Sequence, residues 1–243
     1  MHRRLDPAFF ARAPQQVARD LLGAFLVRRL DGRRIAGRIV EAEAYGGPED
    51  TACHASRGRT DRNRIMFGPP GLAYVYFTYG MHWMLNVVAG EEGFPAAVLI
   101  RAAEPVEGVD LMRRLRGDRL DRELAAGPAR LCQAFAIEGS FYGADLVRGE
   151  LLFFERGDPV REEDVGASPR VGIDYAAKKD IRAPWRFFIR GNPFVSRARP
   201  GPPRERPRGR KRLPPGRKHR GTKSSHLVLR SHGVFPRNFA EEI

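Results

Sequence analysis

The chain has 243 residues, enough for one large domain or two small ones, and 42% of them are hydrophobic. Its formal net charge of +14 at pH 7 indicates a polyanionic partner, with nucleic acid ahead of a membrane surface. The only cysteines are Cys53 and Cys132, which excludes a disulfide framework, and no C-x-x-C motif suggests a zinc site.

The positive charge is concentrated at the end of the chain. Residues 197–243 contain 14 Lys and Arg but only 3 Asp and Glu, so they carry +11 and the first 196 residues carry +3. This tail is rich in Pro, Gly and Arg, so we expect it to be disordered. It could contact nucleic-acid phosphates non-specifically, be a solvated appendage, or come from an altered reading frame.

The cellular location follows from the apolar pattern. No apolar run reaches membrane-spanning length, and residues 1–7 lead into no long apolar segment of the kind found in signal peptides. We therefore expect an intracellular protein without a membrane contact, located in the cytoplasm or nucleoid if it is bacterial.

The first 70 residues predict a helix, a hairpin and a long loop. Residues 14–22 have apolar side chains on one face and a proline suited to the first helical turn. Residues 24–30 and 34–42 predict two strands joined by a turn at Asp31-Gly32, and the second strand continues to Tyr45. Residues 49–70 predict a long ordered loop, and such loops are often functional.

A second hairpin is predicted from residues 74–79 and 82–89, with Gly80 as the break and Tyr79 at the tip. Beyond it we expect two helices and several strands: helices at 106–115 and 127–137, and strands at 97–102, 151–154, 170–173 and 187–190. Because the hairpins favour antiparallel pairing, we predict an α+β fold with one domain over residues 1–196.

Glu41 and Glu43 lie two residues apart at the end of a predicted strand. Their side chains should share a face, about 6.6–6.8 Å apart along the strand. Paired carboxylates at such a distance suit the hydrolysis of a glycosidic bond. The spacing leaves open whether both carboxylates take part in the reaction or only one.

Five aromatic residues are expected near these carboxylates and the long loop: Tyr45, Tyr74, Tyr76, Tyr79 and Trp83. Core packing would explain most of them, but a tyrosine at a hairpin tip is hard to bury. Enzymes that unstack DNA need an exposed aromatic wedge of this kind. His54 follows in the loop, and because it and Cys53 have no second pair of candidate ligands, no metal site is predicted.

Eight sequence stretches resemble the alkyladenine (3-methyladenine) DNA glycosylase family and occur in the order of the family. They are VEAEAY at 40–45, GPED at 47–50, RNR at 62–64, YVYFTYGM at 74–81 with Asn86, LIRA at 99–102, GPARLCQA at 127–134, RVGI at 170–173 and RFFIRG at 186–191. The resemblance covers roughly residues 7–196 and does not include the tail.

The resemblance implies a compact α+β domain with a curved antiparallel sheet and surrounding helices. It also implies a monofunctional glycosylase that removes alkylated or deaminated purines from double-stranded DNA in base excision repair. Such an enzyme is expected to be a monomer and to need neither a cofactor nor a metal.

The resemblance also implies roles for individual residues. Glu43 matches the general base that activates a water molecule, and Arg101 matches a residue that holds this water and the nearby backbone. Glu41 is not carried over as catalytic.

For the base pocket, Tyr45, His54 and Tyr76 match the walls around a flipped base. Electron-rich rings would favour the positive charge of an N-alkylated purine. Asn86 matches the residue that disfavours purines with an exocyclic amine in the minor groove, and Tyr79 matches the wedge that fills the gap in the duplex.

Three other functions stay open from the sequence. One is a nucleic-acid-binding module that has lost catalysis. Another is a carbohydrate hydrolase that uses Glu41 and Glu43 and does not depend on Tyr79. The third is a formyl-transfer type of enzyme with a related sheet, which would need a cofactor site that the sequence does not reveal.

Overall fold

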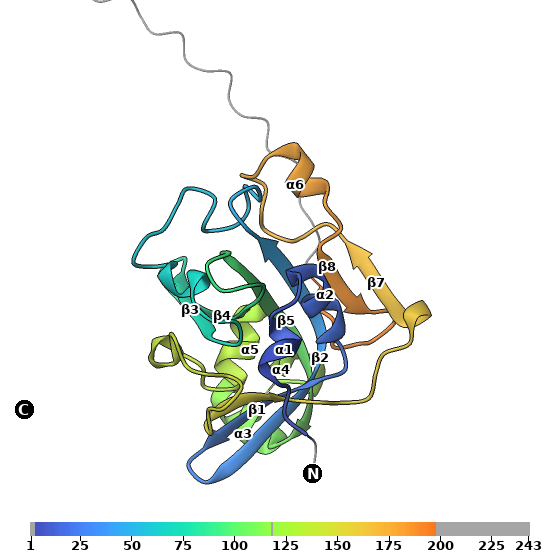
Figure 1. The fold of residues 1–243 in the computed structure, drawn as a ribbon. Helices are drawn as coiled ribbons and strands as arrows, with labels where there is room; N and C mark the ends of the chain where they lie inside the picture. The colour runs from blue at the N-terminus through green and yellow to red at the C-terminus, as the bar shows by residue number, and fades with distance from the viewer. Residues whose placement is uncertain (1–2, 118, 198–243) are drawn as a thin grey trace, which may run out of the picture. The chain divides into compact units, whose positions relative to one another are not determined.

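An antiparallel sheet forms the centre of the fold (Figure 1). The computed structural model describes residues 3–117 and 119–197, so the predicted tail lies outside the described residues apart from Arg197. Within them the strand order is β3 (Ala73–Thr78), β4 (His82–Val88), β5 (Ala96–Glu107), β2 (Arg33–Gly46), β1 (Phe25–Leu30) and β6 (Leu152–Glu155). The last two strands, β7 (Val165–Ser168) and β8 (Arg186–Ile189), pair with each other, and β8 also pairs with β2. The α+β fold class and the antiparallel sheet are therefore confirmed.

Short helices surround the sheet. They are α1 (Pro7–Phe10), α2 (Pro14–Asp20), α3 (Val109–Arg116), α4 (Asp121–Leu124), α5 (Pro128–Ala134) and α6 (Lys178–Arg182). Helix α2 packs on β2 and β5, whereas α5 packs on β4 and β5 (Figure 1). Within the described residues, no helix is long and apolar enough to cross a membrane.

The two faces of the sheet have different roles. Because side chains alternate along a strand, one face carries aliphatic residues that enter the main core: Ala42, Ala44, Val75, Leu85, Val87, Val98 and Ile100. The opposite face carries a row in which Tyr74 is paired with Asn86, Asn86 with Leu99, and Leu99 with Glu43. This row places a carboxylate, an amide and a phenol from distant parts of the sequence on one surface.

A bulge between β2 and β5 places Arg101. Glu41 pairs with Ala102 and the next residue, Ala42, pairs with Ile100, so Arg101 is an extra residue in β5. Bulges of this kind redirect a side chain and are frequent beside active sites.

Both predicted hairpin turns are present. Asp31 and Gly32 have φ of 49° and 73°, and Tyr79 and Gly80 have φ of 52° and 68°. Two consecutive residues with positive φ are typical of the type I′ turn, whose twist matches that of a hairpin. The second turn places Tyr79 at the tip, as predicted.

Two predicted elements are wrong in place or type. Residues 170–173 are not a strand, because Gly172 has φ of 77° and the amide of Val171 binds a side chain rather than a neighbouring strand. The helix predicted at 106–115 begins only at Val109, since β5 continues to Glu107 and Gly108, at φ of 71°, separates the two.

The other differences are smaller. The helix predicted to end at residue 137 ends at Ala134, and the predicted loop at 49–70 includes a 3₁₀ turn at Arg64–Phe67. Three short helices, α1, α4 and α6, were not predicted, because segments of four or five residues are too short to show a helical period.

Candidate active site

A cavity of about 250 Å³ lies on the sheet face opposite the main core. Its lining brings together the predicted pocket residues and several others: Tyr45, Ala52, His54, Met66, Tyr74, Tyr76, Thr78, Tyr79, Met84, Asn86, Ala97, Leu99, Arg101, Pro128, Val171, Gly172, Ile173 and Tyr175. The predicted residues Tyr45, His54, Tyr76, Tyr79, Asn86 and Arg101 therefore share one cavity. A flat heteroaromatic base suits a space of this size and composition better than a chain of sugars.

Glu43 lies directly behind the cavity lining and has no exposed surface. Its Oε1 accepts a hydrogen bond from Val171 N at 2.8 Å and lies 3.3 Å from Nη1 of Arg101. Its Oε2 accepts a hydrogen bond from the hydroxyl of Tyr45 at 2.9 Å. All three partners line the cavity, so the carboxylate is held immediately beneath the cavity floor.

Glu41 is also fully buried, but its oxygens are already occupied. Oε1 accepts from Nε of Arg101 at 2.7 Å, from Nε of Arg186 at 2.7 Å and from Oγ of Ser196 at 2.9 Å, and Oε2 accepts from Ser196 N at 2.7 Å. Burial raises the pKa of Glu41, but the charges of Arg101 and Arg186 and these hydrogen bonds outweigh it, so the pKa is below its ordinary value. Glu41 therefore holds Arg101 and does not line the cavity.

Arg101 connects the two carboxylates. Burial lowers the pKa of Arg101, but the charges of Glu43 and Glu41 more than offset this, so the pKa is above its ordinary value and the guanidinium is permanently charged. The bulge in β5 and the two carboxylates fix this charge at the cavity wall.

Five tyrosines and a histidine give the cavity its aromatic lining, and Tyr45, Tyr74, Tyr76 and His54 form a group within it. The Tyr76 ring centroid lies 5.3 Å from that of Tyr74 and 4.7 Å from that of His54. Burial raises the pKa of Tyr45, Tyr74 and Tyr76, so all three phenols are neutral near pH 7. The cavity therefore presents neutral π-systems.

His54 is open to solvent on one side and packed against tyrosines on the other. Its Nδ1 lies 2.7 Å from the hydroxyl of Tyr74. Burial, and then the charge of Arg62, lower the pKa of His54 below its ordinary value. His54 is therefore a neutral wall residue that can accept or donate a hydrogen bond, depending on its tautomer.

Asn86 is buried in the middle of the sheet row, and its Nδ2 donates to Tyr74 O at 3.0 Å. The amide group is therefore held in one orientation at the cavity wall.

The hairpin tip stands at the mouth of the cavity. Tyr79 is 80% exposed, although it also lines the cavity, and Met81 beside it is 65% exposed. Large apolar side chains at such exposure suggest a surface that is covered in a complex. The expectation that Trp83 joins this cluster is wrong, because Trp83 packs on Phe77 and on the main core.

The loop at residues 171–175 is the main site element that the sequence does not predict. Val171 N binds Glu43, and the hydroxyl of Tyr175 donates to Ala52 O at 3.0 Å across the cavity. The RVGI stretch could have indicated this loop, because a glycine in a short apolar run often breaks a strand. Nothing in the sequence around Tyr175 indicates its role.

A buried ion pair anchors that loop to the end of β2. Arg170 forms a bidentate pair with Asp50, at 2.6 Å and 2.8 Å, and donates to Ala44 O at 2.9 Å. The GPED and RVGI stretches, far apart in sequence, therefore meet directly behind the cavity.

No other feature of the described residues matches this cavity. A more open cleft of about 980 Å³ lies between the N-terminal helices and residues 156–165, but its lining has one aromatic ring. Its three arginines, Arg12, Arg19 and Arg156, are paired with Asp20, Glu162 and Asp6. Within residues 3–117 and 119–197, no group of three His, Cys, Asp or Glu could hold a metal ion.

Comparison with known proteins shows the family to which the chain belongs. Residues 8–193 match the family model of methylpurine-DNA glycosylase (MPG). Several relatives carry the name "Putative 3-methyladenine DNA glycosylase", and two of them show the extent of the similarity. The one from Carboxydothermus hydrogenoformans is 51% identical over 79% of this chain and 98% of its own, and the one from Methanocella arvoryzae is 50% identical over 79% and 96%. The chain therefore belongs to the methylpurine-DNA glycosylase family.

Proposed function

We propose that the protein flips alkylated or deaminated purines out of duplex DNA and hydrolyses the N-glycosidic bond of the extruded nucleotide. Membership of the family makes the chain a DNA glycosylase, which is a hydrolase acting on N-glycosyl bonds. The observation that carries the finer proposal is the buried carboxylate of Glu43 beneath a cavity with neutral aromatic walls.

Glu43 is the proposed general base. Its Oε1 is engaged by Val171 N and Arg101, whereas the described residues give Oε2 one donor, the Tyr45 hydroxyl. A carboxylate oxygen can accept two hydrogen bonds. Oε2 therefore has an acceptor position for a water molecule, which Glu43 would orient and deprotonate as the sugar–base bond breaks.

Glu41 is proposed to support the site and not to react. Four hydrogen bonds occupy it, and Arg101 lies between it and the cavity. This arrangement favours a mechanism with one reacting carboxylate over the paired mechanism of many carbohydrate hydrolases.

The leaving group explains why one base is enough. An N-alkylated purine carries a positive charge that makes it a good leaving group, and each ring wall can stabilise that charge by about 0.5–2 kcal/mol. Deaminated purines are neutral and would rely on their fit to Tyr45, Tyr76 and His54. Asn86 would disfavour purines with an exocyclic amine in the minor groove, as in unmodified guanine.

Tyr79 is the proposed wedge, because extrusion of a base leaves a gap whose lost stacking costs a few kcal/mol. Its position at a type I′ turn, at 80% exposure, lets the ring enter a duplex without disturbing the core. Exposed basic residues suited to phosphates occur in the long loop, at Arg57 and Arg59, and on α6, at Lys178 and Lys179.

The direct test is a panel of duplexes that each contain one 7-methylguanine, hypoxanthine or ethenoadenine. Abasic sites are scored by alkaline strand cleavage, with an undamaged duplex and a heat-inactivated enzyme as controls. We expect cleavage at the lesion in at least one alkylated and one deaminated duplex. Tight binding without an abasic site in any duplex would instead indicate a binding module.

A further inference from the structure

Two of the tyrosines that line the cavity, Tyr45 and Tyr76, have an arginine packed against the ring. The guanidinium carbon of Arg170 lies 4.8 Å from the ring centroid of Tyr45, and that of Arg62 lies 5.0 Å from the ring centroid of Tyr76. Neither arginine lines the cavity. Each guanidinium therefore contacts its tyrosine from outside the space that a base would enter.

The two arginines differ in whether a carboxylate neutralises the guanidinium charge. Arg170 is buried and its charge is compensated by the bidentate pair with Asp50. Arg62 is exposed, donates from Nη2 to Phe77 O at 3.2 Å, and takes part in no ion pair found among residues 3–117 and 119–197. The positive charge behind Tyr76 is thus not neutralised by a neighbouring carboxylate.

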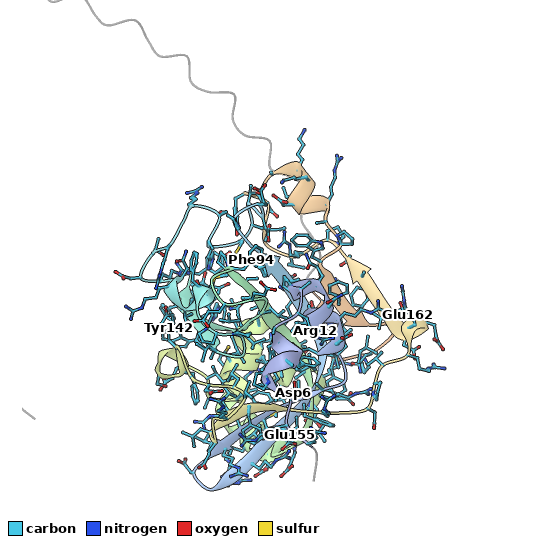
Figure 2. The ribbon with its side chains drawn as sticks, in the orientation of Figure 1. Asp6, Arg12, Phe94, Tyr142, Glu155 and Glu162 are labelled. Atoms are coloured by element: carbon cyan, nitrogen blue, oxygen red, sulfur yellow. The ribbon has the colours of Figure 1, made fainter. Side chains whose placement is uncertain are left out.

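The loop that carries Arg62 is held in place on both sides of it. Nδ2 of Asn63 donates to the carbonyl oxygens of His54 and Gly58, both at 2.9 Å. The hydroxyl of Tyr142, which Figure 2 labels at the β3 side of the molecule, donates to Asp61 O at 3.2 Å. These bonds keep the backbone of Arg62 beside Tyr76.

A ring that already contacts one cation is a weaker partner for a second. The face of an aromatic ring attracts a cation through its quadrupole. A cationic base on the cavity side of Tyr76 would lie about 8–9 Å from the guanidinium, which is about one Debye length at physiological salt, so the repulsion between them is reduced by screening but not abolished. The like charges therefore repel across the ring, whereas a neutral base does not feel this repulsion.

We propose that Arg62 determines lesion specificity, by lowering the preference of the cavity for cationic N-alkylpurines relative to neutral damaged purines. This inference rests on the proposed function and identifies a residue that balances the two substrate classes. The neutral form of His54 is consistent with this role of Arg62. Burial and the charge of Arg62 lower the pKa of His54, so its ring adds no further positive charge near pH 7.

The test compares single-turnover excision of 7-methylguanine, which is cationic, with that of hypoxanthine, which is neutral, in otherwise identical duplexes. In Arg62→Gln the ratio of the two rates should rise about three- to tenfold in favour of the cationic base. Arg62→Lys keeps the charge and should stay close to the wild-type ratio. Arg64→Gln removes the same charge from an exposed arginine two residues away, so it controls for the general loss of attraction to DNA.

An unchanged ratio in Arg62→Gln, or an equal change in Arg64→Gln, would overturn the inference while the proposed function stands. If the wild-type protein excises neither base, the proposed function fails and the inference fails with it. A shift in Arg62→Gln that Arg62→Lys does not reverse would assign the effect to packing and would also contradict the proposal.

Discussion

Replacing Glu41 or Glu43 by Gln should affect different properties of the protein: Glu41→Gln mainly its stability, and Glu43→Gln mainly its rate of excision. Glu41→Gln removes the charge that pairs with Arg101 and Arg186, and it turns an amide group toward donors such as Ser196 N. Breaking a buried ion pair on one side costs about 3–5 kcal/mol. For a chain of this size that corresponds to a fall in Tm of about 6–20 °C.

Glu43→Gln has a milder structural effect. Its amide oxygen can still accept from Val171 N, and its amide nitrogen can donate to the Tyr45 hydroxyl. The substitution also removes the charge that faces Arg101, but Arg101 keeps its shorter pair with Glu41, so we expect a loss of stability of about 1–3 kcal/mol. Loss of the general base, in contrast, should lower the rate of excision by about 10²–10⁴-fold.

The assay measures Tm by differential scanning calorimetry and the single-turnover excision rate at 25 °C, well below both transitions. Glu41→Gln should lose stability and keep its rate within about tenfold of wild type, since Glu43 is retained. If Glu41→Gln has the wild-type Tm but loses excision as fully as Glu43→Gln, both carboxylates react and the single-base account is wrong.

Three further predictions concern the wedge, acid stability and the tail. Tyr79→Ala should slow the extrusion of ethenoadenine from the duplex about 5- to 100-fold, measured by the fluorescence of the ethenoadenine. The Tm should not change, because the side chain of Tyr79 is 80% exposed. An unchanged extrusion rate would show that Tyr79 is not the wedge. The pKa of Glu41 is lower in the folded chain than its ordinary value of 4.5, so its contribution to stability is complete above pH 4.5 and is lost as the pH falls through the folded pKa. Urea titrations of wild type and Glu41→Gln should therefore converge below pH 4.5, and parallel curves would contradict this. Deleting residues 198–243, which keeps Ser196, should make the dependence of DNA affinity on salt less steep; an identical slope would show that the tail makes no phosphate contacts.

Local sequence features predicted the hairpins well. Asp31-Gly32 and Tyr79-Gly80 each provide residues that adopt positive φ, and the flanking strands show clear β-branched and aromatic patterns. The position of Tyr79 followed from this local chemistry alone. Trp83 was misplaced because adjacent strand residues point to opposite faces, so Trp83 could not join Met84 on the cavity side.

Contacts between distant segments could not be predicted from local patterns. Arg101 reaches both carboxylates because of a bulge in β5, and a bulge depends on how two strands pair. Ser196 binds Glu41 from 155 residues away, and no period or motif relates them. Both features hold the reacting groups in place. The sequence motifs therefore identified the residues suited to the chemistry better than the contacts that position them.

The central claim is that Glu43 performs hydrolysis in a pocket that recognises damaged purines independently of it. The most direct measurement is the Kd of Glu43→Gln for a duplex with one hypoxanthine, made beside its single-turnover excision rate. The account predicts a Kd within about threefold of wild type together with a rate at least about a hundredfold lower. Excision at the wild-type rate by Glu43→Gln would contradict it.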